Sequence, residues 1–401
     1  MKVLFLSAWF PYPPDNGSRI RAYNLIKALS AEHTVYLISL LQEDSSRESA
    51  GPLEDFCKVW SLHESRWFRP GTLRSVLGLF SRRPRSVVDT FDRRVRRSVE
   101  EAVKQTCPDV IVASTIGVAE YVPSDISVPC VLEEHNCEFA VMRRSAELSA
   151  GRLMQGRAWL GWKKAAMWEA SVCRRFDTVV MVSDRDRDDL LAVASDLPSV
   201  QVVPNGVDTE RYTPEGYDPE PGAVVYNGGL TYGANLDAVR FYADSIYPIL
   251  RERMPGVKLM VTGRTPDVDL HGINDCAGIE LVGYVDDIRT VLRHSSVCVV
   301  PLRQGGGSRL KILEAMASGV PVVSTTVGAE GIDCMPGKHL LIADEPGDFA
   351  TAIQRVLTDH DLATRLSGEA RALVVSNYNW TTIGKQFVGL VEETAAKRRA
   401  G

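Results

Sequence analysis

The chain has 401 residues, which is more than one ordinary domain holds and suits two domains of about 200 residues each. A hydrophobic fraction of 45% and a charged fraction of 24% are typical of a folded globular protein, so a disordered or collagen-like chain is excluded. The net charge of −5 argues against a nucleic-acid-binding protein.

The sequence gives no sign of a membrane span, a secretion signal or a metal site. No apolar run approaches the roughly 20 residues that a bilayer span needs, and the apolar run at residues 3–6 is too short for a signal-peptide core. The eight cysteines form no C-x-x-C pair, and the pattern of Asp and His residues suggests no metal. We expect a cytoplasmic protein with reduced thiols, no metal and no cofactor, either free or peripheral on the inner face of the cytoplasmic membrane.

Short apolar runs alternate with helical stretches through the first half of the chain. Strands that are apolar on both faces and separated by helices are typical of a parallel sheet covered on both sides. The predicted strands are residues 3–8, 34–40, 109–113, 128–132 and 178–183, and the predicted helices include 19–31 and 138–175.

The Pro-rich loop of residues 9–16 follows the first predicted strand and precedes the first predicted helix. Backbone N–H groups at a helix N-terminus can bind a phosphate, and Gly17 lets the backbone come close to one. Asn16, Arg19 and Arg21 would then bind a substrate at the same place. The alternative is that a Pro-rich turn merely connects two elements.

Ten arginines and two aspartates give the segment from Arg66 to Arg97 a local charge of +8. One apolar helix face, spaced as i, i+3, i+4 and i+7, lies within this segment at Leu73, Val76, Leu77 and Phe80. A basic amphipathic segment suits contact with an anionic membrane or a phosphorylated substrate. The alternative is that the apolar face packs on the domain core and the arginines are solvated or paired.

The alternating pattern restarts after Pro204 and predicts a second domain. Its predicted strands are residues 223–226, 258–262, 280–282, 297–301, 321–325 and 339–342, and its clearest helix is 235–254. We therefore expect two doubly wound α/β domains, residues 1–203 and 204–380. Because ligands bind beyond the carboxyl ends of such strands, the two domains are expected to face each other across a cleft.

Two loops of the second domain have the composition of phosphate-binding loops. Gly228 and Gly229 follow the strand at 223–226, and Arg264 follows the strand at 258–262. The strand that ends at Pro301 is followed by three consecutive glycines: Gly305, Gly306 and Gly307. Consecutive glycines let backbone N–H groups approach an anion, although they also form ordinary flexible turns.

The helix after these glycines is predicted to begin near Ser308, which can cap it. Arg309 and Lys311 then lie in its first turn, where cations oppose the helix dipole unless an anion is bound. Glu314, one turn after Lys311, can accept hydrogen bonds from two hydroxyls, as in a ribose. The loop and the helix together predict a nucleotide-diphosphate site.

The segments Ser308–Pro321 and Ser324–Gly331 resemble the donor site of family 4 glycosyltransferases, which have the GT-B fold. The resemblance covers essentially the whole chain, since further matching segments are Phe5–Ser7, Pro204–Asp208 and Tyr378–Trp380. It implies that a sugar passes from a nucleotide diphosphate sugar to a glycan, lipid-linked or small-molecule acceptor, with retention of anomeric configuration. It also implies a last helix, residues 381–401, that crosses back onto the N-terminal domain.

The resemblance gives roles to several residues. Glu314 matches the carboxylate that holds the ribose, while Arg309 and Lys311 are expected to stabilise the leaving diphosphate. His135, with Asn136 beside it, lies where the family contacts the transferred sugar. The family's usual Glu-x7-Glu pair is incomplete, because Gly306 stands eight residues before Glu314. Backbone N–H groups of 305–308 and Leu310 are therefore expected to contact the donor.

Two other functions remain possible from the sequence. A nucleotide-sugar epimerase has a related two-domain fold and would use no acceptor. A two-lobed sugar-binding protein also has twin doubly wound domains, but the phosphate-binding loop with Glu314 argues against it.

Overall fold

The computed structural model describes residues 1–46, 50–147, 152–266, 268–306 and 309–397. The chain divides into two compact units. Unit 1 contains Met1–Pro204 and the residues from Ile383 onward, and unit 2 contains Asn205–Thr382. Within the described ranges, no helix is both long enough and apolar enough to span a membrane.

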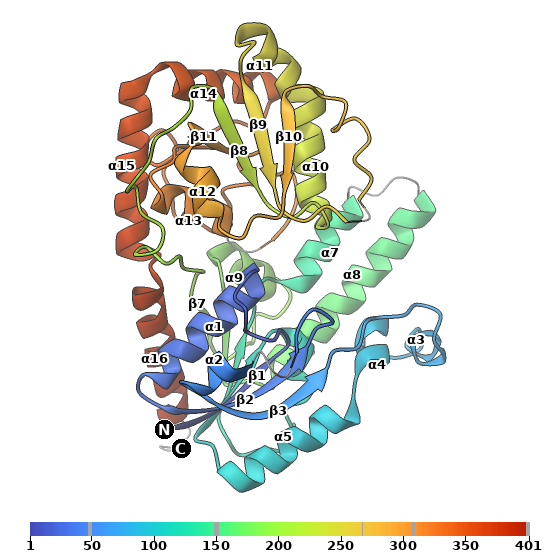
Figure 1. The fold of residues 1–401 in the computed structure, drawn as a ribbon. Coiled ribbons are helices and arrows are strands. Elements are labelled where there is room, and N and C mark those ends of the chain that lie inside the picture. Colours follow the sequence, from blue (N-terminus) through green and yellow to red (C-terminus); the bar gives the residue numbers. More distant parts are fainter. Residues whose placement is uncertain (47–49, 148–151, 267, 307–308, 398–401) are drawn as a thin grey trace. The chain divides into compact units, whose positions relative to one another are not determined.

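Unit 1 is built around a parallel sheet of seven strands in the order β3-β2-β1-β4-β5-β6-β7 (Figure 1). The strands are β1 (Lys2–Ser7), β2 (Thr34–Leu41), β3 (Lys58–Glu64), β4 (Val110–Ser114), β5 (Cys130–Glu133), β6 (Thr178–Met181) and β7 (Val200–Val202). The central strands β4, β5 and β6 are buried at every residue, as expected when helices cover both faces of a parallel sheet. From β1 the chain first adds strands on one side of the sheet, β2 and β3, and then on the other side, β4 to β7. The neighbouring strands β1 and β4 pair in parallel.

The helices of unit 1 connect these strands. They are α1 (Gly17–Ser30), α2 (Gly51–Glu54), α3 (Leu73–Leu77), α4 (Arg85–Thr90), α5 (Arg93–Thr106), α6 (Ile116–Ala119), α7 (Glu138–Glu147), α8 (Arg152–Cys173) and α9 (Asp184–Leu191). The helices α7 and α8 pack side by side, whereas the short helices α3 and α4 project from the edge of the unit (Figure 1).

The last helix, α16 (Trp380–Lys397), starts in unit 2 and packs in unit 1. Its apolar side chains Ile383, Phe387 and Val391 are buried. A Cβ atom at Gly384 would lie 2.7 Å from the Cβ of Ala28, so the small residue permits close packing on α1. The hydroxyls of Thr394 and Thr178 hydrogen-bond at 2.8 Å, which joins α16 to β6.

Unit 2 contains a six-stranded parallel sheet in the order β10-β9-β8-β11-β12-β13. The strands are β8 (Ala223–Asn227), β9 (Lys258–Thr262), β10 (Ile279–Gly283), β11 (Val297–Val300), β12 (Val322–Ser324) and β13 (Leu341–Ile342). The helices are α10 (Gly233–Phe241), α11 (Tyr247–Arg253), α12 (Ile288–Arg293), α13 (Leu310–Ala317), α14 (Pro346–Thr358) and α15 (His360–Asn377). Here the strand order reverses between β8 and β11.

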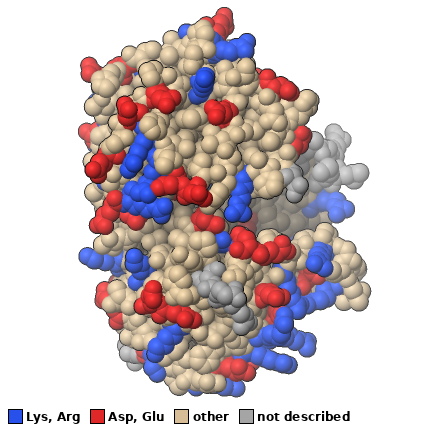
Figure 2. Space-filling view, viewed as in Figure 1, with Lys and Arg blue, Asp and Glu red and all other residues tan. Residues whose placement is uncertain are grey.

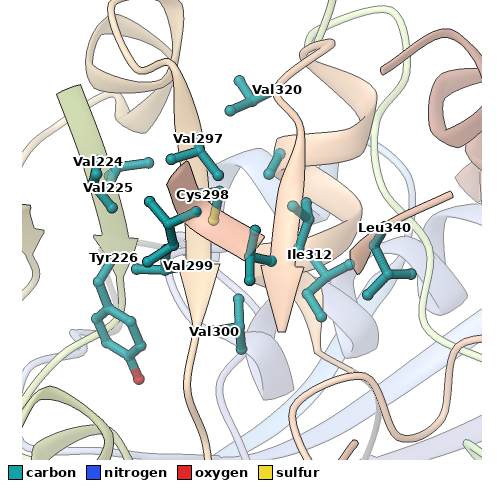
Figure 3. Close-up of a cluster of buried hydrophobic side chains, with 14 of the residues drawn as sticks. Val224, Val225, Tyr226, Val297, Cys298, Val299, Val300, Ile312, Val320 and Leu340 are labelled. Carbon is teal, nitrogen blue, oxygen red and sulfur yellow. The ribbon is translucent and has the colours of Figure 1, made fainter. Parts of the chain in front are cut away.

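Apolar side chains of β8, β11 and α13 form the centre of the unit 2 core (Figure 3). Val224, Val299 and Ile312 are fully buried there. Tyr226 lies at the end of β8, and its ring and hydroxyl extend away from the valines (Figure 3). This core fixes the strand ends from which the polar loops start.

Several elements differ from those predicted. The helix expected at 235–254 is interrupted by a π-helical turn, Tyr242–Ile246, which the structure places just before Pro248. Proline has no N–H for the normal i→i−4 bond, so the helix widens there. Strands β3 and β7 were not predicted. They are edge strands with few buried residues, and β7 has only three residues.

Candidate functional site

The candidate donor site lies at the point in unit 2 where the strand order reverses. Open α/β sheets bind ligands at this point, beyond the carboxyl ends of the strands. The loop that contains Gly228 and Gly229 follows β8, and the loop that contains Gly305 and Gly306 follows β11. The sheet order therefore brings together the two glycine loops that sequence patterns singled out separately.

Lys311 on α13 lies beside the β8 loop. Its ammonium donates hydrogen bonds of 2.9 Å to the Tyr226 hydroxyl and 2.9 Å to Oδ1 of Asn235. The same ammonium lies 4.1 Å from the centroid of the Tyr226 ring. Burial, together with the positive charge of Arg309, lowers the pKa of Lys311 to about 7. Lys311 is thus held beside the β8 loop, and its ammonium group loses its proton at a lower pH than an ordinary lysine does.

Glu314 lies one turn after Lys311 on the same helix face. Its Oε1 accepts a hydrogen bond of 3.1 Å from the Tyr212 hydroxyl, and its Oε2 accepts one of 2.9 Å from Nδ2 of Asn227. Burial raises the pKa of Glu314 to about 7, although the hydrogen bonds and Lys311 oppose that rise. Each carboxylate oxygen keeps a second lone pair, so Glu314 can still accept hydroxyl hydrogen bonds.

Glycine is required at two positions around this site. Gly228 has φ +158, and a Cβ atom there would lie 2.7 Å from Nζ of Lys311. Gly263, at the end of β9, has φ +114, and its Cβ would lie within 2.6 Å of the Gly228–Gly229 backbone. The β8 loop therefore packs directly on the β9 loop, where only a residue without a side chain fits.

The structure corrects the predicted start of the donor helix. Helix α13 begins at Leu310, and Arg309 occupies its N-cap position without a side-chain cap. Gly307 and Ser308 lie outside the described residues. As the first helical residue, Leu310 has a backbone N–H with no acceptor inside the helix, and such groups bind anions.

Arg309 is buried and bonded to its own loops, which was not predicted. Its guanidinium donates to the carbonyl oxygens of Gly306 and Val327. In this structure Arg309 therefore holds the β11 loop in place, and Lys311 is the cation that reaches the β8 loop. Arg264 is exposed, and its guanidinium lies 5.1 Å from the centroid of the Tyr284 ring.

In unit 1, the predicted helix N-terminus is present but its arginines are internal. Gly17 begins α1, and Oδ1 of Asn16 accepts a hydrogen bond of 3.2 Å from the N–H of Arg19. The Arg19 guanidinium is buried and bonds Asp15 at 3.1 Å and Asp44 at 2.5 Å. These carboxylates are the partners of the guanidinium in this structure, and the substrate-binding role of Arg19 stays a prediction.

Arg21 is equally buried and binds groups far away in sequence. Its Nε donates to Oε1 of Glu133 at 2.5 Å, and its terminal nitrogens donate to the carbonyls of Pro204 at 3.0 Å and Val203 at 2.9 Å. Its predicted role in substrate binding likewise stays a prediction. Arg21 joins α1 to the end of β5 and to the last residues of unit 1's main segment.

His135 lies just beyond β5, with a side chain that is 11% exposed. Its Nε2 is 3.2 Å from Oε2 of Glu133 and 3.2 Å from the Ser114 hydroxyl. Asn136 does not join this group, since its side chain hydrogen-bonds Glu138. Among the residues that can be described, no group of three or more His, Cys, Asp or Glu side chains could hold a metal ion.

Sequence patterns missed several residues of these groups. Tyr226 and Asn235 bond to Lys311, and Asn227 and Tyr212 bond to Glu314. The available signal was a polar residue at the end of an apolar strand, as at Asn227. Tyr212 carried no such signal, because only the fold brings it to α13.

Known proteins resemble this chain along most of its length. A family model described as Glycosyltransferase Family 4 matches residues 15–211, and one described as Glycosyl transferases group 1 matches residues 221–359. An uncharacterized 44.6 kDa protein in the cps region of Klebsiella pneumoniae is 23% identical over 94% of this chain and 96% of that protein.

Two further likenesses bear on activity and fold. A GDP-mannose-dependent alpha-(1-6)-phosphatidylinositol monomannoside mannosyltransferase of Mycobacterium tuberculosis is 24% identical over 77% of this chain and 88% of that protein. Among solved structures, sucrose-phosphate synthase from Thermosynechococcus elongatus has a TM-score of 0.73 and 16% identity, with 99% of each chain covered. That likeness shows a common fold.

Proposed function

Because this chain belongs to the family 4 glycosyltransferases and has their GT-B fold, we propose that it transfers a hexose from a nucleoside diphosphate sugar with retention of anomeric configuration. The observation that carries the proposal is the pairing of Lys311 and Glu314 on one face of α13, between the two glycine loops. A cation for the diphosphate and a carboxylate for the ribose are the groups that such a donor needs.

The chemistry asked of the protein is stabilisation of a leaving diphosphate. As the bond between the anomeric carbon and the diphosphate breaks, negative charge grows on the diphosphate oxygens. Lys311, the glycine N–H groups and the N-terminus of α13 supply positive charge there. The acceptor hydroxyl attacks the same face of the sugar, and its proton passes to the departing diphosphate, which gives retention.

This supply of charge makes transfer independent of a metal ion in our proposal. The test is release of nucleoside diphosphate from a panel of sugar nucleotides, with and without acceptor, in the presence of EDTA. We expect release that depends on acceptor and persists in EDTA. Lys311→Met should lower it at least about ten-fold, whereas Lys258→Met, at an exposed lysine of β9, should not. Release without acceptor, or release that EDTA abolishes, would contradict the proposal.

We further propose that unit 1 binds an anionic membrane, where a lipid-linked acceptor would reside. The relative from Mycobacterium tuberculosis is named for such an acceptor, a phosphatidylinositol monomannoside. The supporting surface is the α3 patch, which we define as the exposed apolar residues Trp67, Phe68, Leu73, Val76, Leu77, Leu79 and Phe80. Leu73 is 74% exposed and Phe80 is 88% exposed, so this apolar face does not pack on the core.

Basic side chains surround the α3 patch. Figure 2 shows Lys and Arg gathered beside uncharged surface at the edge of unit 1 where α4 and the start of α5 lie in Figure 1. Arg82 is exposed, whereas Arg83 pairs with Glu120 at 3.3 Å and Arg85 binds the Ser75 and Pro70 carbonyls. Exposed apolar groups beside the exposed Arg82 match the interface of an anionic bilayer.

A face of α8 continues this surface. Lys164 donates a hydrogen bond of 2.8 Å to the carbonyl of Gly78, which joins α8 to the α3 segment. Trp159, Leu160 and Met167 of α8 are 52%, 64% and 69% exposed. Lys163, on the same helix, lies 4.6 Å from the centroid of the Trp162 ring.

Sedimentation with vesicles that contain an anionic phospholipid tests the membrane proposal. Each basic residue near an anionic surface contributes about 1 kcal/mol, so Arg82→Glu should weaken binding by about 2 kcal/mol, or roughly 30-fold. Phe80→Ser should weaken it as well, by about 1–2 kcal/mol, because it removes an inserted ring. Arg251→Glu changes an exposed arginine of unit 2 and serves as the control. Equal binding by all three variants would refute the proposal.

A further inference from the structure

The carboxylate of Glu133 is the meeting point of a buried hydrogen-bond network in unit 1. Its Oε1 accepts from Nε of Arg21 at 2.5 Å. Its Oε2 accepts from the Ser114 hydroxyl at 2.6 Å and lies 3.2 Å from Nε2 of His135. Glu133 is fully buried, so these partners rather than water determine which groups carry protons.

Glu133 acts in this network as an ionised acceptor. Burial alone would raise its pKa, but the charge of Arg21, together with the hydrogen bond from the Ser114 hydroxyl, holds the pKa of Glu133 well below its usual range. Arg21 is always charged and compensates the carboxylate. An ionised carboxylate can only accept hydrogen bonds, so the neighbouring atoms at Oε2 must be donors.

This constraint places the proton of His135. If Nε2 carried a lone pair, two acceptors would face each other at 3.2 Å, because the Ser114 proton is already directed at Glu133. The neutral imidazole therefore carries its proton on Nε2, and Nδ1 carries the lone pair. In the described part of the chain, Nδ1 of His135 is buried and has no hydrogen-bond partner. A buried acceptor without a donor is unfavourable, and a ligand hydroxyl that donates to it would remove that cost.

We propose that Glu133 is a positioning residue: it holds the proton of His135 on Nε2, so that Nδ1 is left to accept a hydrogen bond from a hydroxyl group of the bound substrate. The second half of this inference rests on the proposed glycosyl transfer, while the proton position does not. Arg21 takes part indirectly, because it keeps Glu133 ionised and fixes the orientation of the carboxylate.

Glu133→Gln gives a sharp test because Arg21 dictates how the new amide is oriented. Arg21 only donates, so the amide oxygen must occupy the Oε1 position. The amide NH₂ then replaces Oε2 beside Nε2 of His135. Since an NH₂ group donates, His135 must become an acceptor at Nε2, and its proton must move to Nδ1.

Glu134→Gln is the matched control. Glu134 is also fully buried, but its Oε2 accepts from the N–H of Ile116 at 3.0 Å. Burial, reinforced by the charge of Glu169, raises the pKa of Glu134 well above its ordinary value. A glutamine at 134 can still accept the hydrogen bond from the N–H of Ile116 through its amide oxygen. It should leave both the proton position at His135 and the rate of transfer unchanged.

The readout is nitrogen-15 NMR of histidine-labelled full-length protein, recorded above the ordinary range of histidine ionisation. His135 is assigned among the seven histidines by the signals that disappear in His135→Asn. We expect the Nε2–H form in the wild type and in Glu134→Gln, and the Nδ1–H form in Glu133→Gln. Steady-state kinetics should show kcat lowered about ten-fold or more in Glu133→Gln, with a smaller change in the KM for donor.

The proposal is overturned if His135 of the wild type carries a proton on Nδ1, whether on Nδ1 alone or on both ring nitrogens. This outcome is decisive even if Glu133→Gln fails to fold. Unchanged tautomer and kcat in a folded Glu133→Gln overturn it as well. If no sugar nucleotide supports transfer, the proposed function fails, and the tautomer of the wild type still decides the role of Glu133. A shift of the Nδ1 signal on adding substrate supports the hydrogen bond to a hydroxyl, and an unmoved signal under saturation rules it out.

Discussion

Donor affinity should fall as the pH rises above about 7, because Lys311 must be charged to bind the diphosphate. Burial and the charge of Arg309 lower the pKa of Lys311 to about 7 in the ligand-free protein. Above that pH the free protein carries a neutral Lys311, and binding must add a proton. An ammonium beside a phosphate keeps its proton to much higher pH, so the cost appears as weaker binding.

The size of the effect follows from that pKa. With a pKa of about 7 in the free protein, the dissociation constant rises in proportion to 1 + 10^(pH−7), which is roughly 50-fold between pH 7 and pH 9. Each further pH unit costs about 1.4 kcal/mol. Glu314 offsets only a small part of this trend: with a pKa raised to about 7, its ionised form, which accepts ribose hydroxyls, increases at most about two-fold over the same range.

Isothermal titration calorimetry with an intact sugar nucleotide measures this, since its diphosphate has no ionisation between pH 7 and 9. Repeating the titration in buffers with different ionisation enthalpies should reveal uptake of a proton above pH 7. Lys311→Met should bind weakly at every pH and lose the dependence, while Lys258→Met should keep it. A wild-type dissociation constant that changes less than about three-fold between pH 7 and 9 refutes the reasoning.

Two further predictions concern stability and are read by urea unfolding. Gly263→Ala should destabilise unit 2 by about 1–3 kcal/mol, because the φ of +114 at Gly263 and contacts under 2.7 Å with the Gly228–Gly229 backbone exclude a Cβ atom. The control is Gly256→Ala, since a Cβ atom at Gly256 would meet nothing within 4 Å. Equal losses of stability in the two variants would disprove the packing argument. Arg21→Met should lower the free energy of unfolding by about 3–5 kcal/mol, because it leaves the buried charge of Glu133 uncompensated. The control Arg365→Met changes an exposed arginine and should lower it little. A similarly small loss for Arg21→Met would contradict the importance of the ion pair.

The parts of the fold that sequence patterns could predict are those determined locally. Continuous apolar runs such as β4 and β11 are buried on both faces, and their composition alone marks them as central strands. Edge strands such as β3 carry polar residues and depend on pairing with β2, which no local pattern reveals. The interruption of the helix before Pro248 follows from the missing N–H of proline, a local feature that the sequence itself contains.

The candidate site divides in the same way. Gly228, Lys311 and Glu314 were found because a strand, a glycine loop and a helix follow one another in the sequence. Arg19 and Arg21 occupy the same kind of position after β1, yet they bind carboxylates of the protein itself. For Arg21 the difference lies in Glu133, which is 112 residues away in the sequence and meets it only through the sheet. The spacing of residues in the sequence shows where a basic side chain such as Arg21 lies. Its pairing with a residue far away in the sequence determines which group it binds.

The return of α16 to unit 1 has a consequence for how the chain folds as it is made. Unit 1's main segment ends at Pro204, but the residues from Ile383 that complete its core emerge only after unit 2 has been synthesised. At roughly 5–20 residues per second, that interval lasts on the order of 10–40 seconds. During it, the surface that Phe387 and Val391 later cover is open to water. The nascent protein therefore carries an exposed apolar strip on its first unit until α16 has been synthesised.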